Sequence, residues 1–422
     1  MPDPVPTEHQ LSDRARRLVE APVLAEYILA HFAHTEDAWD AEQNPDGYVA
    51  LCIAENRMMW DELGPKLASY DEVPARVLGY DAMIGALEFR TALATFMGTH
   101  ILGRAVDAEQ LAVVAGAGAV LELLFHALAD AGEGVLVPTP SYAGFWSDLE
   151  TRDALKIIPV HGASAEGFRI TPADLDRAMA EAEVPVRALL FTTPNNPMGW
   201  VYGRDELEAI LAWAERRSIH VVFDEIYALS VFGERAFVSA ASLRERLGPL
   251  VHIVWAFSKD FGASGLRCGV LVSENPSVRA AVDALAYWCA CSGDTQYRLG
   301  RLIGDEEFMS WYLSEMPKRL GAGYAAVTRA LDAAAIPYFA AEAGFFLLVD
   351  LRAHLREPSW AAEAELWRTL LSEARVNLTP GSACRIAEPG FFRLCYASEA
   401  PAAVDAAMDR IVRCLGAQGA IR

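Results

Sequence analysis

The strongest restriction on the fold comes from a series of short apolar segments that are separated by helical patterns. The segments do not alternate strictly between polar and apolar residues, which is typical of parallel strands covered by helices on both faces. We therefore predict an α/β domain with a mainly parallel sheet. The expected strands cover residues 111–114, 134–138, 154–160, 188–192, 219–223, 252–257 and 268–272, and the clearest helices cover 86–100, 120–129 and 204–217.

The chain on either side of this region has a different character. It begins polar, carries a turn signal at residues 44–47, and predicts an N-terminal arm with one helix over about 12–34. After Ser292 long helical patterns continue to about residue 335. They are followed by expected strands at 337–339, 344–351 and 391–396. The predicted parts are an arm and helix (1–55), a large ligand-binding α/β domain (56–290) and a small α+β domain (291–422).

Composition excludes several classes of function. Hydrophobic residues make up 53% of the 422 residues and charged residues 22%, which is enough apolar material for a packed core rather than a disordered chain. Acidic residues outnumber basic ones by 57 to 36, giving a formal charge of -21. Such a chain repels phosphate backbones and anionic lipids, so we expect neither nucleic acid nor a membrane as a partner.

Cysteine usage and the first residues indicate the compartment. The seven cysteines are odd in number and form no CxxC pair, so neither a disulfide framework nor a zinc site is expected, and no histidine spacing suggests another metal. The N-terminal sequence MPDPVPTEHQ has no basic region before an apolar run, so no signal peptide is expected. No segment has the composition of a membrane span. We therefore expect a cytoplasmic protein.

Residues able to do chemistry follow the apolar segments. In open parallel sheets, ligands bind beyond the carboxyl ends of the strands, so side chains that follow different strands can meet in one site. Here those positions hold a small-residue turn at 115–119, Tyr142, Asn196, Asp224, Tyr227, Ser258, Lys259 and Arg267.

This set of groups matches the needs of pyridoxal 5'-phosphate (PLP). An aldehyde can be held as a Schiff base by a lysine amine with a lowered pKa. The pyridine nitrogen needs a buried carboxylate in order to stay protonated. The phosphate favours a small-residue turn at a helix N-terminus and a guanidinium group, and the ring favours an aromatic face.

The motifs resemble those of the fold-type I PLP enzymes, the aspartate aminotransferase superfamily, over nearly the whole chain. Within that superfamily the chain is most similar to the 1-aminocyclopropane-1-carboxylate (ACC) synthase branch. Six ordered segments carry the resemblance: NPDGYVALCIAEN (44–56), PTPSYAGF (138–145), NNPMG (195–199), DEIYAL (224–229), SKDFGASGLRCG (258–269) and PGFFRLCYA (389–397). The implied fold is a PLP-binding large domain with a mainly parallel sheet and a smaller α+β domain.

The resemblance implies a role for each cofactor-binding residue. Lys259 would form the Schiff base and later remove the substrate α-proton, while Asp224 would pair with the pyridine nitrogen. Tyr227 and Asn196 would hydrogen-bond the phenolic oxygen of PLP, and Tyr142 would stack on its ring. Arg267 and Ser258 would bind the phosphate together with the backbone amides of Ala117, Gly118 and Ala119.

Other roles concern the substrate and a second subunit. Arg393 would bind the substrate α-carboxylate, and Glu55 would lie close to the substrate. Tyr80 would reach the phosphate of a neighbouring subunit, so we expect a homodimer with shared active sites. Taken singly, each residue also has an ordinary structural interpretation: a helix-capping acid for Asp224, a helix-starting acid for Glu55, or a salt-bridged strand arginine for Arg393.

Four positions depart from the pattern of the branch. Gly118 and Ala256 stand where ACC synthase-like sequences have hydroxyl residues, Ser141 where a tyrosine is common, and Ala143 where proline is common. Phosphate binding is therefore expected to depend on amides, Ser258 and Arg267.

These features predict a PLP enzyme that acts on S-adenosylmethionine by α-deprotonation and Cγ elimination or replacement. The outcome is either cyclisation or a specialised reaction that couples a vinylglycine-type intermediate to a second substrate. The alternative is a class I/II aminotransferase. A PLP-binding regulator or degenerate scaffold would show a DNA-binding extension or lack the lysine, and the sequence shows neither. We also predict cis peptide bonds at Thr139-Pro140 and Asn196-Pro197, which are often cis in this superfamily.

Overall fold

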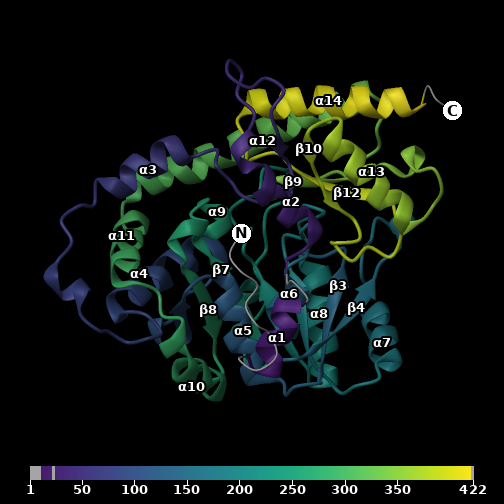
Figure 1. The fold of residues 1–422 in the computed structure, drawn as a ribbon. Coiled ribbons are helices and arrows are strands. Elements are labelled where there is room, and N and C mark those ends of the chain that lie inside the picture. Colours follow the sequence, from purple (N-terminus) through teal and green to yellow (C-terminus); the bar gives the residue numbers. More distant parts are fainter. Residues whose placement is uncertain (1–10, 21–23, 420–422) are drawn as a thin grey trace.

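The computed structural model describes residues 11–20 and 24–419 (Figure 1). The expectations on residues 1–10, including the polar start of the arm and the lack of a signal peptide, lie outside the described residues. Within the described ranges, no helix combines the length and the hydropathy that crossing a bilayer requires.

A seven-stranded sheet forms the centre of the described chain, in the order β2-β8-β7-β6-β5-β3-β4. Each predicted strand of the large domain is present within a few residues, which confirms the α/β interpretation. The strands are β2 (Leu111–Val114), β3 (Gly134–Thr139), β4 (Lys156–His161), β5 (Val186–Thr192), β6 (His220–Asp224), β7 (Val251–Ala256) and β8 (Gly269–Ser273). All are parallel except β8, which runs antiparallel to both of its neighbours.

The direction of β8 matters for the site. Because β8 is antiparallel, the residue that precedes it lies at the same sheet edge as the residues that follow the parallel strands. Arg267 therefore joins Asp224 and Lys259 at that edge, although it stands before its strand and they follow theirs. The sequence pattern did not distinguish this direction.

Helices cover both faces of the sheet, and alternate strand residues belong to two separate cores. Val114, Leu190 and Val222 pack with α5 (Ala117–Leu128), α6 (Phe145–Glu150) and α10 (Pro276–Leu285). Val113, Leu189 and Phe223 face the other way. That face packs with α4 (Leu87–Met97), α7 (Pro172–Glu181) and α8 (Arg204–Arg217). Burial on both faces explains why the strands read as continuous apolar runs.

A second unit gathers the C-terminal elements, coloured green to yellow at the top of Figure 1. Its antiparallel sheet has the order β11-β12-β9. The strands are β9 (Phe346–Asp350), β11 (Thr379–Pro380) and β12 (Phe391–Cys395), and the helices are α12 (Glu306–Ala333), α13 (Trp360–Ser372) and α14 (Pro401–Gly419). The preceding helix α11 (Gly293–Ile303) packs instead beside α4 of the large domain. The N-terminal strand β1 (Val49–Ala50) pairs in parallel with β10 (Val376–Asn377), so residues near position 50 join this unit. The domain boundaries at 55/56 and 290/291 stay predictions.

Three local expectations need correction or extension. The single helix expected over 12–34 is two helices, α1 (Asp13–Glu20) and α2 (Glu26–His34), with non-helical backbone at residues 24 and 25. Residues 337–339 form no strand, and only Tyr338 makes an isolated bridge, to Val349. Both predicted cis bonds are confirmed, and Thr193-Pro194 is also cis.

Candidate active site

Most of the predicted cofactor residues line one cavity of about 240 Å³ at the carboxyl edge of the large sheet. They come from five different strand ends and from the first turn of α5, which the sheet order brings together. The predicted residues on the wall are Ala117, Gly118, Tyr142, Asn196, Asp224, Tyr227, Ser258, Lys259 and Arg267. Ala119, Glu55, Tyr80 and Arg393 are not among the residues that line it.

Lys259 is held by the short helix α9 (Phe257–Asp260), which begins directly after β7. Its Nζ donates a hydrogen bond to the carbonyl oxygen of Ala54 at 2.7 Å. Burial, helped by the charge of Arg393, lowers the pKa of Lys259 to about 8. A lysine with such a pKa is partly neutral near pH 8 and can attack an aldehyde.

The neighbouring Asp260 fixes the position of α9. Its carboxylate accepts hydrogen bonds from Trp255 Nε1 at 2.8 Å, Ser230 Oγ at 2.7 Å and the Leu229 amide at 3.1 Å. These bonds connect the lysine helix to the segment that follows Asp224. The distance between the Lys259 amine and the Asp224 carboxylate therefore depends on the buried hydrogen bonds of Asp260.

Asp224 ends β6 with its side chain almost fully buried. Thr192 Oγ1 donates to Oδ2 over a long 3.5 Å. Oδ1 is buried and has no hydrogen-bond partner among the described residues. Burial raises the pKa of Asp224 to about 7. A buried carboxylate oxygen without a donor, on the wall of the cavity, fits a protonated ring nitrogen.

Asn196 connects the tyrosine and the arginine. Its Nδ2 donates to Tyr227 Oη at 2.9 Å, and its Oδ1 accepts from Arg393 Nη1 at 3.2 Å. Tyr227 is buried, and burial raises its pKa well above the usual value. The amide orientation thus leaves the phenol hydrogen free to point into the cavity.

Arg393, on β12, is buried without a carboxylate partner. Its Nη2 donates to the Cys52 carbonyl at 2.8 Å and to Thr379 Oγ1 at 3.0 Å, while Nε has no partner among the described residues. No described acidic side chain lies within ion-pair distance of its guanidinium group. The alternative interpretation as a salt-bridged strand arginine therefore has no support, and a buried, uncompensated cation is suited to an anionic ligand.

The turn before α5 is shaped by close contact with Arg267. Gly116 has a positive φ of 94°, and a Cβ on it would lie 2.5 Å from Arg267 Nη2. The guanidinium group donates to the carbonyls of Ser264 at 3.0 Å and Ala115 at 3.3 Å. Only glycine therefore lets the arginine lie at the helix N-terminus. This arrangement suits a phosphate group.

Glu55 lies beside the cavity rather than on its wall. Its Oε1 accepts from Ser264 Oγ at 2.5 Å and its Oε2 from Arg57 Nε at 2.7 Å. Ser264 itself lines the cavity, so the carboxylate is one residue away from it. The interpretation as a helix-starting acid is wrong, because α3 (Trp60–Ala68) begins five positions later.

Tyr142 lines the cavity with its ring edge-on to Phe145, at 5.3 Å between ring centroids. Tyr80 is fully exposed, so the chain alone does not bring it to the cavity.

Sequence reasoning missed three residues. Ser264 and Asp148 both line the cavity, and Tyr27 of α2 is buried where the charge of Arg393 acts on it. Asp148 could have been suspected as an acid one helical turn after the PSYAGF segment. Tyr27 gave no local signal, because its position depends on packing against residues far along the chain.

The residues present fit PLP. Lys259 would hold its aldehyde carbon, the unpartnered oxygen of Asp224 its pyridine nitrogen, and the Gly116 turn with Arg267 its phosphate. Among the described residues no group of three or more His, Cys, Asp or Glu is arranged to hold a metal ion.

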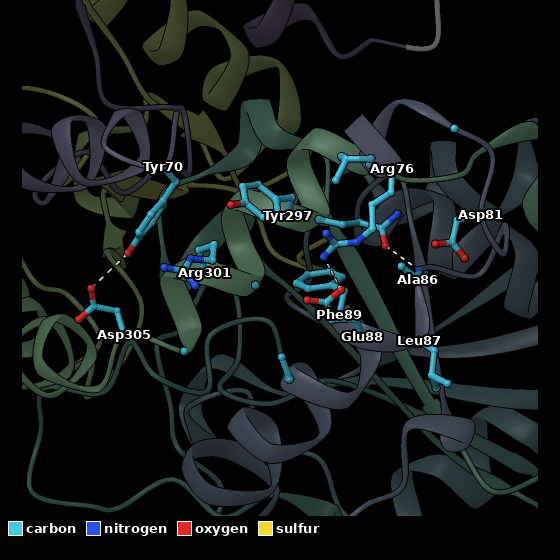
Figure 2. Close-up of a pocket in the computed structure, with 17 residues that line it drawn as sticks. Tyr70, Arg76, Asp81, Ala86, Leu87, Glu88, Phe89, Tyr297, Arg301 and Asp305 are labelled. Atoms are coloured by element: carbon cyan, nitrogen blue, oxygen red, sulfur yellow. Dashed lines mark hydrogen bonds and ion pairs between the residues drawn. The ribbon is translucent and has the colours of Figure 1, made fainter. Parts of the chain in front are cut away.

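A larger cavity of about 520 Å³ lies elsewhere, between η2 (Ala75–Leu78), α4 and α11 (Figure 2). Its polar side chains include Arg76, Glu88, Tyr297 and Arg301. It contains no lysine and none of the predicted site residues. Size alone therefore does not identify the reaction site of this chain.

Comparison with known proteins gives consistent results. The model of the family "Aminotransferase class I and II" matches residues 71–411. ACC synthase 1 of Cucurbita pepo is 33% identical over 96% of this chain and 87% of the relative, and ACC synthase 4 of Oryza sativa subsp. japonica is 36% identical over 93% and 87%. Among solved structures, aspartate aminotransferase of Thermus thermophilus with maleate superposes with a TM-score of 0.81 at 22% identity, covering 96% of this chain and all of that one.

Proposed function

We propose a reaction for this chain from the premise that it belongs to the class I and II aminotransferase family, and that it is a PLP-dependent enzyme with similarity to the ACC synthases. The proposed substrate is S-adenosylmethionine. The proposed reaction removes the α-proton and breaks the Cγ–S bond, whose electron pair leaves with the sulfur of methylthioadenosine. Closure of Cα onto Cγ would then give the cyclopropane.

When bound, PLP supplies an electron sink that makes the Cα–H bond of an attached amino acid acidic. Arg393 binds the substrate α-carboxylate through charge-assisted hydrogen bonds and so fixes the direction of that bond. Lys259 Nζ takes the proton, for which its lowered pKa is suited. Asp224 keeps the pyridine nitrogen protonated from its position at the end of β6.

The observation that best supports S-adenosylmethionine is the placement of Glu55. Its carboxylate is held by Ser264 and Arg57 next to the cavity wall, and Ala54 beside it accepts the hydrogen bond from Lys259. A carboxylate there would attract a sulfonium cation. It would repel the second carboxylate of an acidic amino acid, the substrate expected of an aspartate-type aminotransferase.

The test is to mix purified holoenzyme with S-adenosylmethionine and to measure methylthioadenosine by chromatography. Release of methylthioadenosine together with the cyclopropane amino acid is the expected result. Release without the cyclopropane, with a product that grows on addition of nucleophiles or other co-substrates, would identify the replacement reaction. No release, together with conversion of the bound cofactor to pyridoxamine phosphate by common amino acids, would contradict the proposal and favour the aminotransferase alternative.

The second part of the proposal is a homodimer with shared active sites. Support comes from large apolar side chains that lie exposed on the described chain: Leu78, Tyr80, Leu87, Tyr287 and Trp288 are between 56% and 100% exposed. Leu87 also lines the larger cavity, which is adjacent to the segment that carries Tyr80 (Figure 2). Exposed apolar side chains that gather in one patch mark protein–protein interfaces, and we place these five in the proposed dimer interface. In the dimer Tyr80 would reach the phosphate bound by the other subunit.

The dimer is tested by sedimentation and by mixing variants. Tyr80→Ala and Lys259→Ala should each be inactive or weak, but hybrids formed by co-expression should regain activity, because one of the two sites then has both intact residues. A monomer in sedimentation, or hybrids no better than the parents, would contradict shared sites.

A further inference from the structure

Asp148 is an acid on the wall of the cofactor cavity that the proposed reaction does not use. It lies on α6 and lines the cavity together with Gly118 and Arg267. A Cβ on Gly118 would lie 4.0 Å from Asp148 Oδ1, and no other atom beyond the chain neighbours and the helix backbone would be as near. The carboxylate therefore faces the first turn of α5. Among the described residues it has no hydrogen-bond donor.

The same turn is the place assigned to the phosphate of PLP. The first backbone bond within α5 runs from the Val120 amide to the Gly116 carbonyl at 3.1 Å. The preceding amides therefore have no helical acceptor and point toward any group at the N-terminus. A dianionic phosphate there would face both these donors and the carboxylate of Asp148. Two anions in one partly dry site cannot both keep full charge without a large cost.

We infer that Asp148 is a phosphate-binding residue that acts in its protonated form, donating a hydrogen bond to the cofactor phosphate from the space left open at Gly118. This inference rests on the proposed assignment of the α5 turn to the phosphate. The missing hydroxyl at position 118 explains the arrangement: a carboxylic acid supplies the O–H donor that a serine or threonine would otherwise provide. Binding of the phosphate dianion is then coupled to uptake of one proton by Asp148.

The surroundings of Asp148 favour this protonation. Burial, and then the negative charge of Glu122 on α5, raise the pKa of Asp148 to about 6. Glu122 is partly neutralised by Arg152, with which it forms an ion pair. A bound phosphate would raise the pKa of Asp148 further. The other ionisable groups around Asp148 lie on the cavity wall and on the segments packed against α6. They are Tyr142, Asp224, Tyr227, Lys259 and Arg267 on the wall, His126 on α5, Lys156 and His161 on β4, and Arg385, whose guanidinium lies over the ring of Trp146 on α6.

The test measures affinity rather than turnover. The probe is 4'-deoxypyridoxine 5'-phosphate, which carries the ring and the phosphate but no aldehyde, so Lys259 forms no bond to it. Its dissociation constant is measured by isothermal titration for ligand-free wild type and Asp148→Asn between pH 5.5 and 8.5. The ratio of the two constants is compared at each pH, because the titrations of Asp224 and of the phosphate itself are common to both proteins.

We expect the ratio of wild-type to variant dissociation constants to rise about tenfold per pH unit above the pKa of Asp148, until the pKa of the complex is reached. When it binds the probe above the pKa of Asp148, wild type should also take up about one more proton than Asp148→Asn. This proton uptake is measured by repeating the titration in buffers of different ionisation enthalpy. Glu150→Gln is the matched control, because it removes an acid from the same helix at a residue that does not line the cavity. The ratio of wild-type to Glu150→Gln dissociation constants should stay constant with pH.

A second variant tests the role of the open space. Gly118→Ser places a hydroxyl between the carboxyl and the phosphate, and should tighten wild-type binding at pH 8, whereas Gly118→Ala should not. A ratio for Asp148→Asn that does not change with pH, including uniform weakening at every pH, would overturn the inference and leave Asp148 as a structural partner of α5. Because the probe needs neither S-adenosylmethionine nor the lysine, failure of the proposed reaction would leave these results unaffected.

Discussion

Replacing Asp224 by asparagine should stabilise the ligand-free protein at alkaline pH. The same substitution should lower the affinity for PLP. In the structure one carboxylate oxygen is buried with no donor, and the side-chain bond to the other is a long one from Thr192. The backbone amide of Ile226 also favours the charged form, but burial outweighs both groups. The ionised acid is therefore poorly satisfied in the folded chain. The asparagine side chain would remove the charge and keep an oxygen that accepts from Thr192.

The magnitude follows from the pKa. Folding raises the pKa of Asp224 from 3.8 to about 7. Below the unfolded value both states bind the proton and the group has no effect. Between about pH 4 and pH 7 the folded state alone keeps it, so stability falls as pH rises by about 1.4 kcal/mol per unit, and above about pH 7 the full penalty remains. From pH 5 to pH 8 wild type should lose about 2–3 kcal/mol relative to Asp224→Asn.

The assay is thermal unfolding of both ligand-free proteins at pH 5 and pH 8. The difference between their midpoints should grow by on the order of 2–3 °C between the two pH values, because a chain of 422 residues has an unfolding entropy of roughly 0.9 kcal/mol/K. Glu225→Gln serves as the control for cofactor binding: Glu225 is buried next in sequence, but its carboxylate accepts from Ser239 and Ala240 and does not line the cavity. Of these two variants, only Asp224→Asn should bind PLP more weakly than wild type. A midpoint difference that is the same at both pH values would refute the reasoning.

Three further outcomes are expected. Lys259→Ala should leave no PLP attached after borohydride reduction and peptide mapping, and label on any other residue would show that the lysine is wrongly assigned. Gly116→Ala should cost about 1–3 kcal/mol through its positive φ and displace Arg267, seen as a lower unfolding midpoint and a weaker PLP affinity. Arg393→Lys should raise KM for the amino acid at least tenfold, because lysine cannot form the two-pronged contact with a carboxylate, and an unchanged KM would contradict its role.

The order of chemical groups along the chain was readable from the sequence. Continuous apolar runs identified the strands, because burial on both sheet faces removes polar alternation and leaves a local signal. The residues after those runs then predicted that Asp224, Tyr227 and Lys259 would meet, and the structure places all three on one cavity wall. This succeeded because parallel strands bring their carboxyl ends to the same edge whatever the details of packing.

Other features of the site were decided only by the tertiary structure, because they depend on contacts between residues that are distant in the chain. The antiparallel direction of β8, which brings Arg267 to the site, has no local signature, because a buried strand has the same composition in either direction. The pairing of β1 with β10 carries Cys52 to Arg393 across more than three hundred residues. The approach of Asp148 to Gly118 likewise results from the packing of two helices, which periodicity within either helix does not encode.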